Sequence, residues 1–120
     1  MYFSDSHLWV TLDFDIATIG ITKYAQEELG DIVYIQFPNL GKQLKIGDES
    51  IIVESTKAAT DIYTPLSGIV TDINNDLQNN LNFLNTDPER QGWLMKLKLD
   101  DLQELKKLMT LEQYQKLIEG

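Results

Sequence analysis

Residues 51–63 of the chain read IIVESTKAATDIY, and this stretch decides the fold class. Residues 51–53 and 61–63 contain the β-branched and aromatic side chains that favour strands, whereas residues 54–58 are small or polar. Two strand-forming runs joined by a short polar segment predict a β-hairpin. Lys57 lies at the centre of the predicted turn, where its side chain is lifted clear of the sheet.

Strand patterns continue on both sides of this hairpin. Runs of apolar and β-branched residues alternate with segments rich in the turn-forming residues Gly, Pro, Asn and Asp. The first two runs are close enough to form a hairpin of their own, with a polar turn around Asp13 and Asp15. The expected strands are residues 7–12, 16–21, 32–37, 51–54, 61–63, 69–73 and 93–99.

A short helix is expected after the first hairpin. Thr22 is a favourable N-cap residue, and Tyr24, Ala25 and Leu29 follow at helical spacing. Gly30 is well suited to end the helix, because glycine adopts the backbone conformation that commonly follows a helix C-terminus.

The remaining segments are less regular. Residues 74–92 are polar and rich in asparagine, and we expect a long surface loop there with one helical turn near residues 81–84. The leucines of residues 102–109 fit one face of a helix. Thr110 and Gln113 then form a predicted capping box for a second C-terminal helix.

Many short strands followed by terminal helices predict a mainly β fold, a barrel or sandwich with helical attachments. A chain of 120 residues is long enough for one domain with a modest core and too short for two. We therefore expect residues 1–120 to form a single domain, with its core in residues 7–99 and a helical segment in residues 100–119.

Composition limits the classes of function. The chain has no cysteine, so disulfides, thiolate zinc sites and cysteine nucleophiles are excluded, and redox chemistry would need a bound or attached group. The formal net charge of −9 repels nucleic acid and anionic membrane surfaces; it either attracts basic partner proteins or only aids solubility. No apolar stretch is long enough to span a bilayer, and the first residues show no secretory signal.

Lys57 admits several interpretations on physical grounds. Most lysines on exposed turns are simply solvated. Acylation of the ε-amino group would replace a cation by a neutral amide and change the formal charge from −9 to −10, since one positive charge is lost. Use of the amine as an enzyme nucleophile requires burial or neighbouring cations, whereas Lys57 lies among carboxylates in the sequence.

The residues around Lys57 resemble the lipoyl-lysine hairpin of the glycine cleavage system H protein family. Residues 54–58 read ESTKA and residues 61–68 read DIYTPLSG. The family reads E-S-x-K-A, followed by D-x-Y-x-P-x-x-G. Residues 7–10, HLWV, look like the family's opening H-x-W motif.

The resemblance covers roughly residues 5–118. Residues 17–33, ATIGITKYAQEELGDIV, look like the family's A-x-x-G-I-T…A-Q…L-G-D-[IV]-V block. Residues 83–94, FLNTDPERQGWL, loosely match its late L-[VI]-N…P…G-W-L pattern. Biotinyl carriers usually have methionine on both sides of the lysine. Lipoyl domains of 2-oxoacid dehydrogenases commonly read D-K-A and lack both the H-x-W opening and the helical tail.

The resemblance implies a lipoyl-type barrel-sandwich hybrid and a carrier with no catalytic groups of its own. Lipoate would be joined to Lys57 through an amide and would accept an aminomethyl group and reducing equivalents. The implied partners are a pyridoxal-phosphate glycine decarboxylase, a folate-dependent aminomethyltransferase, dihydrolipoyl dehydrogenase and a lipoate-attaching enzyme. The bacterial cytoplasm is the expected location, or the mitochondrial matrix if a targeting peptide has been removed.

The resemblance also suggests recognition residues around the turn. Glu54, Ser55, Ala58 and Asp61 are candidates for recognition of the hairpin by the lipoate-attaching enzyme. For the two acidic residues the alternative is that they only keep the hairpin solvated.

Other positions have structural interpretations or depart from the family pattern. Pro65 and Gly68 are expected to set the geometry of the next turn. Trp9 and Trp93 are expected to be core aromatics, and His7 to pack or hydrogen-bond. Leu8 replaces a glutamate that family members usually carry, at a position associated with the cleft that shelters the loaded arm. This departure leaves a second hypothesis open, an H-like lipoylated carrier used for lipoate relay or another lipoate-dependent process.

Overall fold

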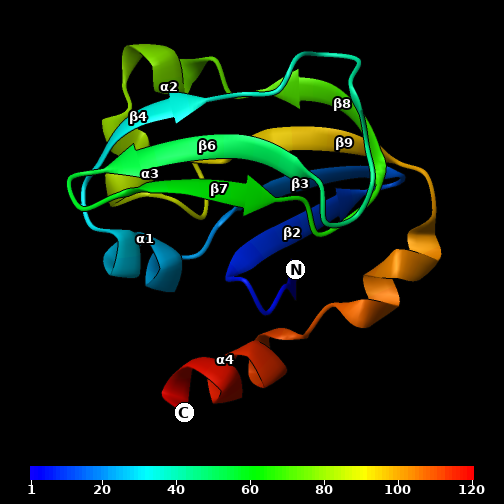
Figure 1. Ribbon diagram of the computed structural model, residues 1–120. Coiled ribbons are helices and arrows are strands. Elements are labelled where there is room, and N and C mark those ends of the chain that lie inside the picture. Colours follow the sequence, from blue (N-terminus) through cyan, green and yellow to red (C-terminus); the bar gives the residue numbers. More distant parts are fainter.

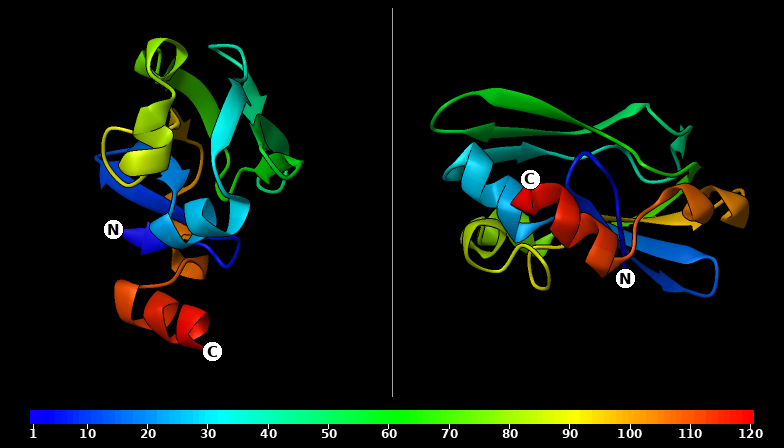
Figure 2. Two further views of the ribbon diagram at one scale, coloured as in Figure 1. Left: turned by 90° about the vertical axis from the view of Figure 1, so that its left-hand side faces the viewer. Right: turned by 90° about the horizontal axis from the view of Figure 1, so that it is seen from below.

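The computed structural model describes residues 1–120, and its strands form two antiparallel sheets that face each other (Figures 1 and 2). The larger sheet has the strand order β1-β2-β3-β9-β8-β5 and the smaller sheet the order β4-β6-β7. The strands are β1 (Tyr2–Phe3), β2 (Leu8–Asp13), β3 (Ile16–Ile21), β4 (Ile32–Gln36), β5 (Gln43–Leu44), β6 (Glu49–Ser55), β7 (Ala59–Tyr63), β8 (Gly68–Ile73) and β9 (Met95–Leu99).

The core lies between the two sheets. Alternate side chains of each strand point inward, as in Val10 and Ile19 of the larger sheet and Ile51, Val53 and Ile62 of the smaller one, and all are buried. They belong to one cluster of 19 buried residues. Burial of each such side chain contributes about 1.5–3 kcal/mol, so the alternation predicted from the sequence determines which face of each strand turns inward.

The helices occupy the ends and edges of the sheets. They are α1 (Lys23–Leu29), α2 (Asp76–Asn79), α3 (Asn82–Thr86), a 3₁₀ helix η1 (Leu102–Lys107) and α4 (Leu111–Glu119). The predicted caps of α1 are confirmed, because the Thr22 hydroxyl accepts a hydrogen bond from the Ala25 amide and Gly30 ends the helix at φ +81°. The capping box of Thr110 and Gln113 is confirmed at α4. None of these helices is long and apolar enough to cross a membrane.

The prediction of a mainly β chain with a helix after the first hairpin and helices at the C-terminal end is confirmed. Three details differ. Residues 74–92 contain two short helices rather than a surface loop with one helical turn, and Leu77 and Leu84 of these helices are buried in the core. Residues 102–107 form a 3₁₀ helix. The two-residue strands β1 and β5 are too short for a periodic pattern to reveal.

The C-terminal segment is tied to the larger sheet by backbone and aromatic contacts. Phe3 and Met109 exchange two backbone hydrogen bonds of 2.9 and 2.7 Å. Phe3, Trp9 and Tyr114 form a second buried cluster, in which the rings of Phe3 and Tyr114 stack at 4.7 Å between centroids. Trp9 is therefore a core aromatic as predicted, and half-buried Trp93 packs against the same cluster.

Gly68 has a structural role, but for a different reason from the one predicted. It begins β8 and pairs with Leu99 and Leu44 on its two sides, rather than setting a turn. A Cβ atom at this position would overlap the backbone carbonyl of Lys98. Close approach of two strands therefore requires the glycine.

Substitution of Gly68→Ala is expected to lower the free energy of unfolding by about 3 kcal/mol, the upper end of the overpacking range, because the backbone of two strands must separate to admit a methyl group. Urea denaturation measures the change. Gly41→Ala is the control: Gly41 has φ +84° and no atom within 4 Å of an added Cβ, so only a backbone cost of about 1 kcal/mol is expected. An equal or smaller loss at Gly68 would contradict the close-approach explanation.

Candidate functional site

Lys57 lies in the turn between β6 and β7, at one end of the molecule (Figure 1). The side chain is exposed, as are Thr56 and Ala58 on either side. The pairing of Glu54 with Ala59 is the last of the hairpin before the turn. The structure therefore presents the amine at the tip of a strand pair whose inward-facing side chains lie in the core.

The Ser55 side chain orders the backbone of the turn. Its hydroxyl oxygen accepts hydrogen bonds from the amides of Lys57 at 3.1 Å and Ala58 at 3.2 Å, and the hydroxyl donates to the Ala58 carbonyl at 3.3 Å. The Ser55 amide also donates to the Ala58 carbonyl at 2.9 Å. A serine that satisfies the amides two and three residues ahead holds a turn in one conformation.

A second set of hydrogen bonds ties the turn to the rest of the molecule. The Thr56 amide donates to the Asp31 carbonyl at 3.0 Å. The next residue, Ile32, is held through its backbone by Asn85, which accepts from the Ile32 amide at 2.8 Å and donates to the Ile32 carbonyl at 3.1 Å. The sequence interpretation missed Asn85 as a site residue, and its place in the L-[VI]-N pattern was the only available signal.

The Lys57 side chain folds back over Gly30. A Cβ atom built on Gly30 would lie 3.5 Å from Cε and 3.8 Å from Cδ of Lys57. Gly30 combines a positive φ with this close approach, so it both ends α1 and leaves room for the aliphatic part of the lysine.

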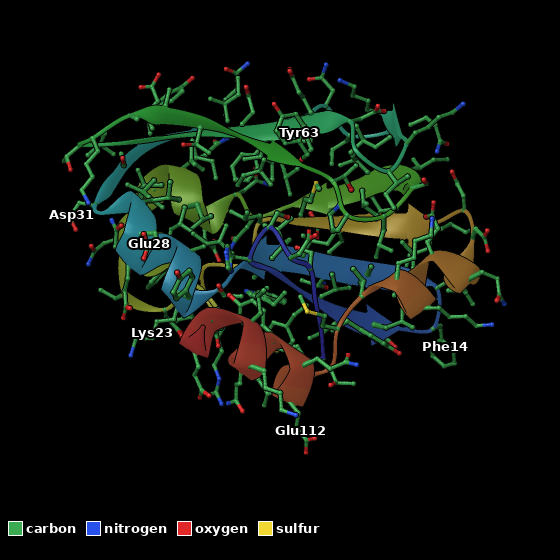
Figure 3. The ribbon with its side chains drawn as sticks, turned by 60° about the horizontal axis from the view of Figure 1, so that its bottom comes forward. Phe14, Lys23, Glu28, Asp31, Tyr63 and Glu112 are labelled. Atoms are coloured by element: carbon green, nitrogen blue, oxygen red, sulfur yellow. The ribbon has the colours of Figure 1, made fainter.

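A cleft of about 200 Å³ lies beside the turn, between α1, the free edge of β7 and the start of β2. Its lining is mostly apolar and includes Leu8, Ile21, Ala25, Leu29 and Ile62. Exposed Glu28 and Asp61 contribute the carboxylates of the lining. Figure 3 shows Glu28 on α1 and Asp31 at the corner that follows this helix. The cleft lies close to the turn, because its lining includes Leu29, one residue before Gly30, and Thr60, three residues after Lys57.

One wall of the cleft is held by a tyrosine from the C-terminal helix. The Tyr114 hydroxyl lies 2.9 Å from His7 Nδ1 and 2.7 Å from the Thr22 hydroxyl. His7 lines the cleft and has φ +69°, an unusual backbone conformation for a residue with a side chain. Burial raises the pKa of the Tyr114 phenol above its ordinary value, the Thr22 hydrogen bond lowers it, and Glu89 and Tyr24 add smaller increases.

The predicted recognition residues fall into two groups. Ser55 and Ala58 lie in the turn with Lys57, and Asp61 lines the cleft. Glu54 is exposed on the outer face of the smaller sheet, opposite Tyr34 and Ala59. His7 has the hydrogen-bonding role that was expected, and Leu8 is 3% exposed at the cleft.

Comparison with known proteins identifies relatives along the full chain. A family model described as "Glycine cleavage H-protein" matches residues 1–120. A glycine cleavage system H protein from Parvibaculum lavamentivorans is 48% identical over 118 residues, which is 98% of this chain and 94% of that protein. A probable glycine cleavage system H protein 1 from Sulfolobus acidocaldarius is 44% identical and aligns with 94% of this chain and 82% of its own length.

A solved structure shares the fold. The crystal structure of a glycine cleavage system H protein from Mycobacterium marinum superimposes with a TM-score of 0.89 at 28% sequence identity. The superposition covers 99% of this chain and 96% of that one. The expected fold class is thereby confirmed, with two facing antiparallel sheets rather than a closed barrel.

Removal of the Ser55 hydroxyl is expected to loosen the turn without unfolding the hairpin. In Ser55→Ala the amides of Lys57 and Ala58 lose their acceptor and should exchange with solvent about tenfold faster or more, which corresponds to about 1.4 kcal/mol of local protection. Hydrogen exchange by NMR measures this. Thr56→Ala is the control, since no hydrogen bond of the Thr56 side chain is present. Unchanged exchange in Ser55→Ala would contradict the proposed ordering.

Tyr114→Phe is expected to lower the free energy of unfolding by about 1–3 kcal/mol, because His7 and Thr22 lose a buried partner.

The raised pKa of Tyr114 means that the folded chain holds the phenol proton more tightly than the unfolded chain. Stability should therefore fall as pH rises above the ordinary value of 10.0, and the phenylalanine variant should lack this contribution. Denaturation at neutral and alkaline pH measures both effects, with exposed Tyr34→Phe as the control. A variant as stable as the wild-type chain at neutral pH would refute the role of the hydroxyl.

Proposed function

The chain belongs to the glycine cleavage H-protein family, and we propose that Lys57 is the residue to which its lipoyl group is attached. The protein is a non-catalytic lipoyl carrier of the glycine cleavage system, and it works with the enzymes of that system. The observation that carries the assignment of Lys57 is its position as an exposed lysine at the centre of an ordered hairpin turn.

The geometry of the turn supports this assignment in two ways. An attaching enzyme must enclose the amine, and a hairpin tip can enter an active site that a flat surface cannot. The Asp31 carbonyl holds the Thr56 amide and the Ser55 side chain holds the next two amides, so little conformational freedom is lost when the tip is bound. We include Ser55 and Ala58 among the residues that set the shape recognised by the attaching enzyme.

The residues beside the turn fit a lipoyl group. Such a group offers an aliphatic chain and two sulfur atoms that carry a one-carbon unit and reducing equivalents. Leu8, Ile21 and Leu29 provide apolar contact for the chain. Glu28 and Asp61 offer carboxylates to an amine-bearing load at the more exposed part of the cleft. The aliphatic part of Lys57 already lies over Gly30, next to α1.

The specific partners are part of the same proposal. We assign the loading step to a pyridoxal-phosphate glycine decarboxylase, the unloading step to a folate-dependent aminomethyltransferase and the reoxidation to dihydrolipoyl dehydrogenase. Acylation removes the cation of Lys57 from a surface that carries Glu28, Asp31, Glu54 and Asp61. Basic groups around the active-site entrances of these enzymes would complement the resulting negative surface.

Intact mass after incubation with a lipoate-attaching enzyme, ATP and lipoate tests the assignment. The wild-type chain should gain the mass of one lipoyl group, and Lys57→Arg should gain none, because an arginine cannot form the amide. Lys45→Arg is the control, since Lys45 is also an exposed lysine next to a turn. Only the lipoylated wild-type and control chains should then support glycine decarboxylation with the three partner enzymes. A lipoyl increment that persists in Lys57→Arg would refute the assignment.

A further inference from the structure

The hairpin of β2 and β3 ends in an unusual turn. Asp13 pairs with Ile16, so Phe14 and Asp15 form a two-residue loop. Phe14 is 93% exposed, more than any other large apolar side chain of the molecule. Figure 3 shows its ring directed away from the rest of the structure. We refer to Asp13, Phe14 and Asp15 as the Phe14 tip.

The backbone at this position disfavours phenylalanine. Phe14 has φ +56°, in the left-handed region where a Cβ atom crowds the following carbonyl group. The first position of a two-residue hairpin loop with positive φ is normally glycine, and asparagine is tolerated. Bulky residues are rarely found there. Replacement by glycine would therefore relieve strain and lose no core contact.

Folding does not account for this residue. The phenyl ring buries almost no surface within the chain, so it contributes no hydrophobic stabilisation to the folded state. Phe14 thus combines two independent unfavourable features, a strained backbone and an almost fully exposed aromatic ring. Residues held in such conformations often act in recognition, and aromatic side chains are enriched at the centres of protein interfaces.

The charges next to Phe14 indicate what would bind it. Asp13 and Asp15 flank Phe14 in the chain: Asp13 is the last residue of β2, and Asp15 is the second residue of the loop. A recess that accepts the ring must therefore be apolar inside and basic at its rim. A second copy of this chain is a poor candidate, because each copy carries a formal net charge of −9.

The location separates this tip from the lysine. The turn of Lys57 and the Phe14 tip lie at opposite ends of the molecule in two views (Figures 1 and 2), and the longest dimension of the chain is 36 Å. We propose that the Phe14 tip is a docking point for an enzyme of the glycine cleavage system, which inserts Phe14 into an apolar recess with a basic rim. The choice of partner rests on the proposed function. Contact at this end leaves the lipoyl end of the carrier free to move.

The proposal is tested with unlipoylated protein, so that the lipoyl arm plays no part in binding. Biolayer interferometry measures the binding of this protein to each of the three partner enzymes. Phe14→Gly and Phe14→Asn both remove the ring and both suit a positive φ. Their dissociation constants for at least one enzyme should be about tenfold higher or more, as for the loss of an interface anchor. Their thermal unfolding midpoints should equal or exceed that of the wild-type chain. Leu40→Ser, at another exposed apolar residue, is the control and should bind as the wild-type chain does.

Charge provides an independent readout. The dissociation constant of the wild-type chain should rise with ionic strength, and the double variant Asp13→Asn, Asp15→Asn should show a weaker dependence. The proposal would be overturned if both Phe14 variants bound all three enzymes with wild-type affinity. It would also be overturned if the chain self-associated through Phe14, or if the unlipoylated wild-type protein bound none of the enzymes. Lys57→Arg should bind normally in this assay, so a wrong lipoylation site and a wrong docking point give different results.

Discussion

The register of the β6–β7 hairpin is the constraint on which the rest of the site depends. Ile51, Val53 and Ile62 point into the core, and side chains on a strand alternate between faces. A slip of one residue would turn these three side chains outward and bring polar neighbours into the core. Because the core fixes the register, it also fixes which residues remain for the turn. Lys57 is therefore exposed at the tip as a consequence of burial along the inner face of the two strands.

Fixing the register does not by itself order the tip, and polar contacts complete the arrangement. Ser55 holds the turn internally, while the Asp31 carbonyl holds it against the corner after α1. That corner is in turn held by Asn85 through Ile32. Residues from three distant parts of the sequence thus position one exposed lysine. An arm attached at Lys57, as proposed, could be mobile while its point of attachment stayed well defined.

Features that depend on residues close together in the sequence could be predicted, whereas features that depend on residues far apart were missed. The caps of α1 at Thr22 and Gly30 and the capping box of α4 depend on residues a few positions apart, so a local pattern reveals them. Lys57 was singled out as the candidate attachment site because the motif around it lies in fifteen consecutive residues, 54–68. Asn85 was missed because its partner Ile32 is 53 positions away. Glu89, whose carboxylate accepts a hydrogen bond from the Lys23 amide at the start of α1, was missed for the same reason.

Leu8 shows how a departure from a family pattern can be understood physically. With 3% of its surface exposed, it occupies a position where a carboxylate would lose most of its hydration. Glu28 and Asp61 line the same cleft but are exposed, so their carboxylates keep contact with water. The cleft therefore combines buried apolar residues with charged residues where solvent reaches it. Under the proposed function, an aliphatic arm would gain from the first and a cationic load from the second, so the absence of a carboxylate at Leu8 would leave both kinds of contact in place.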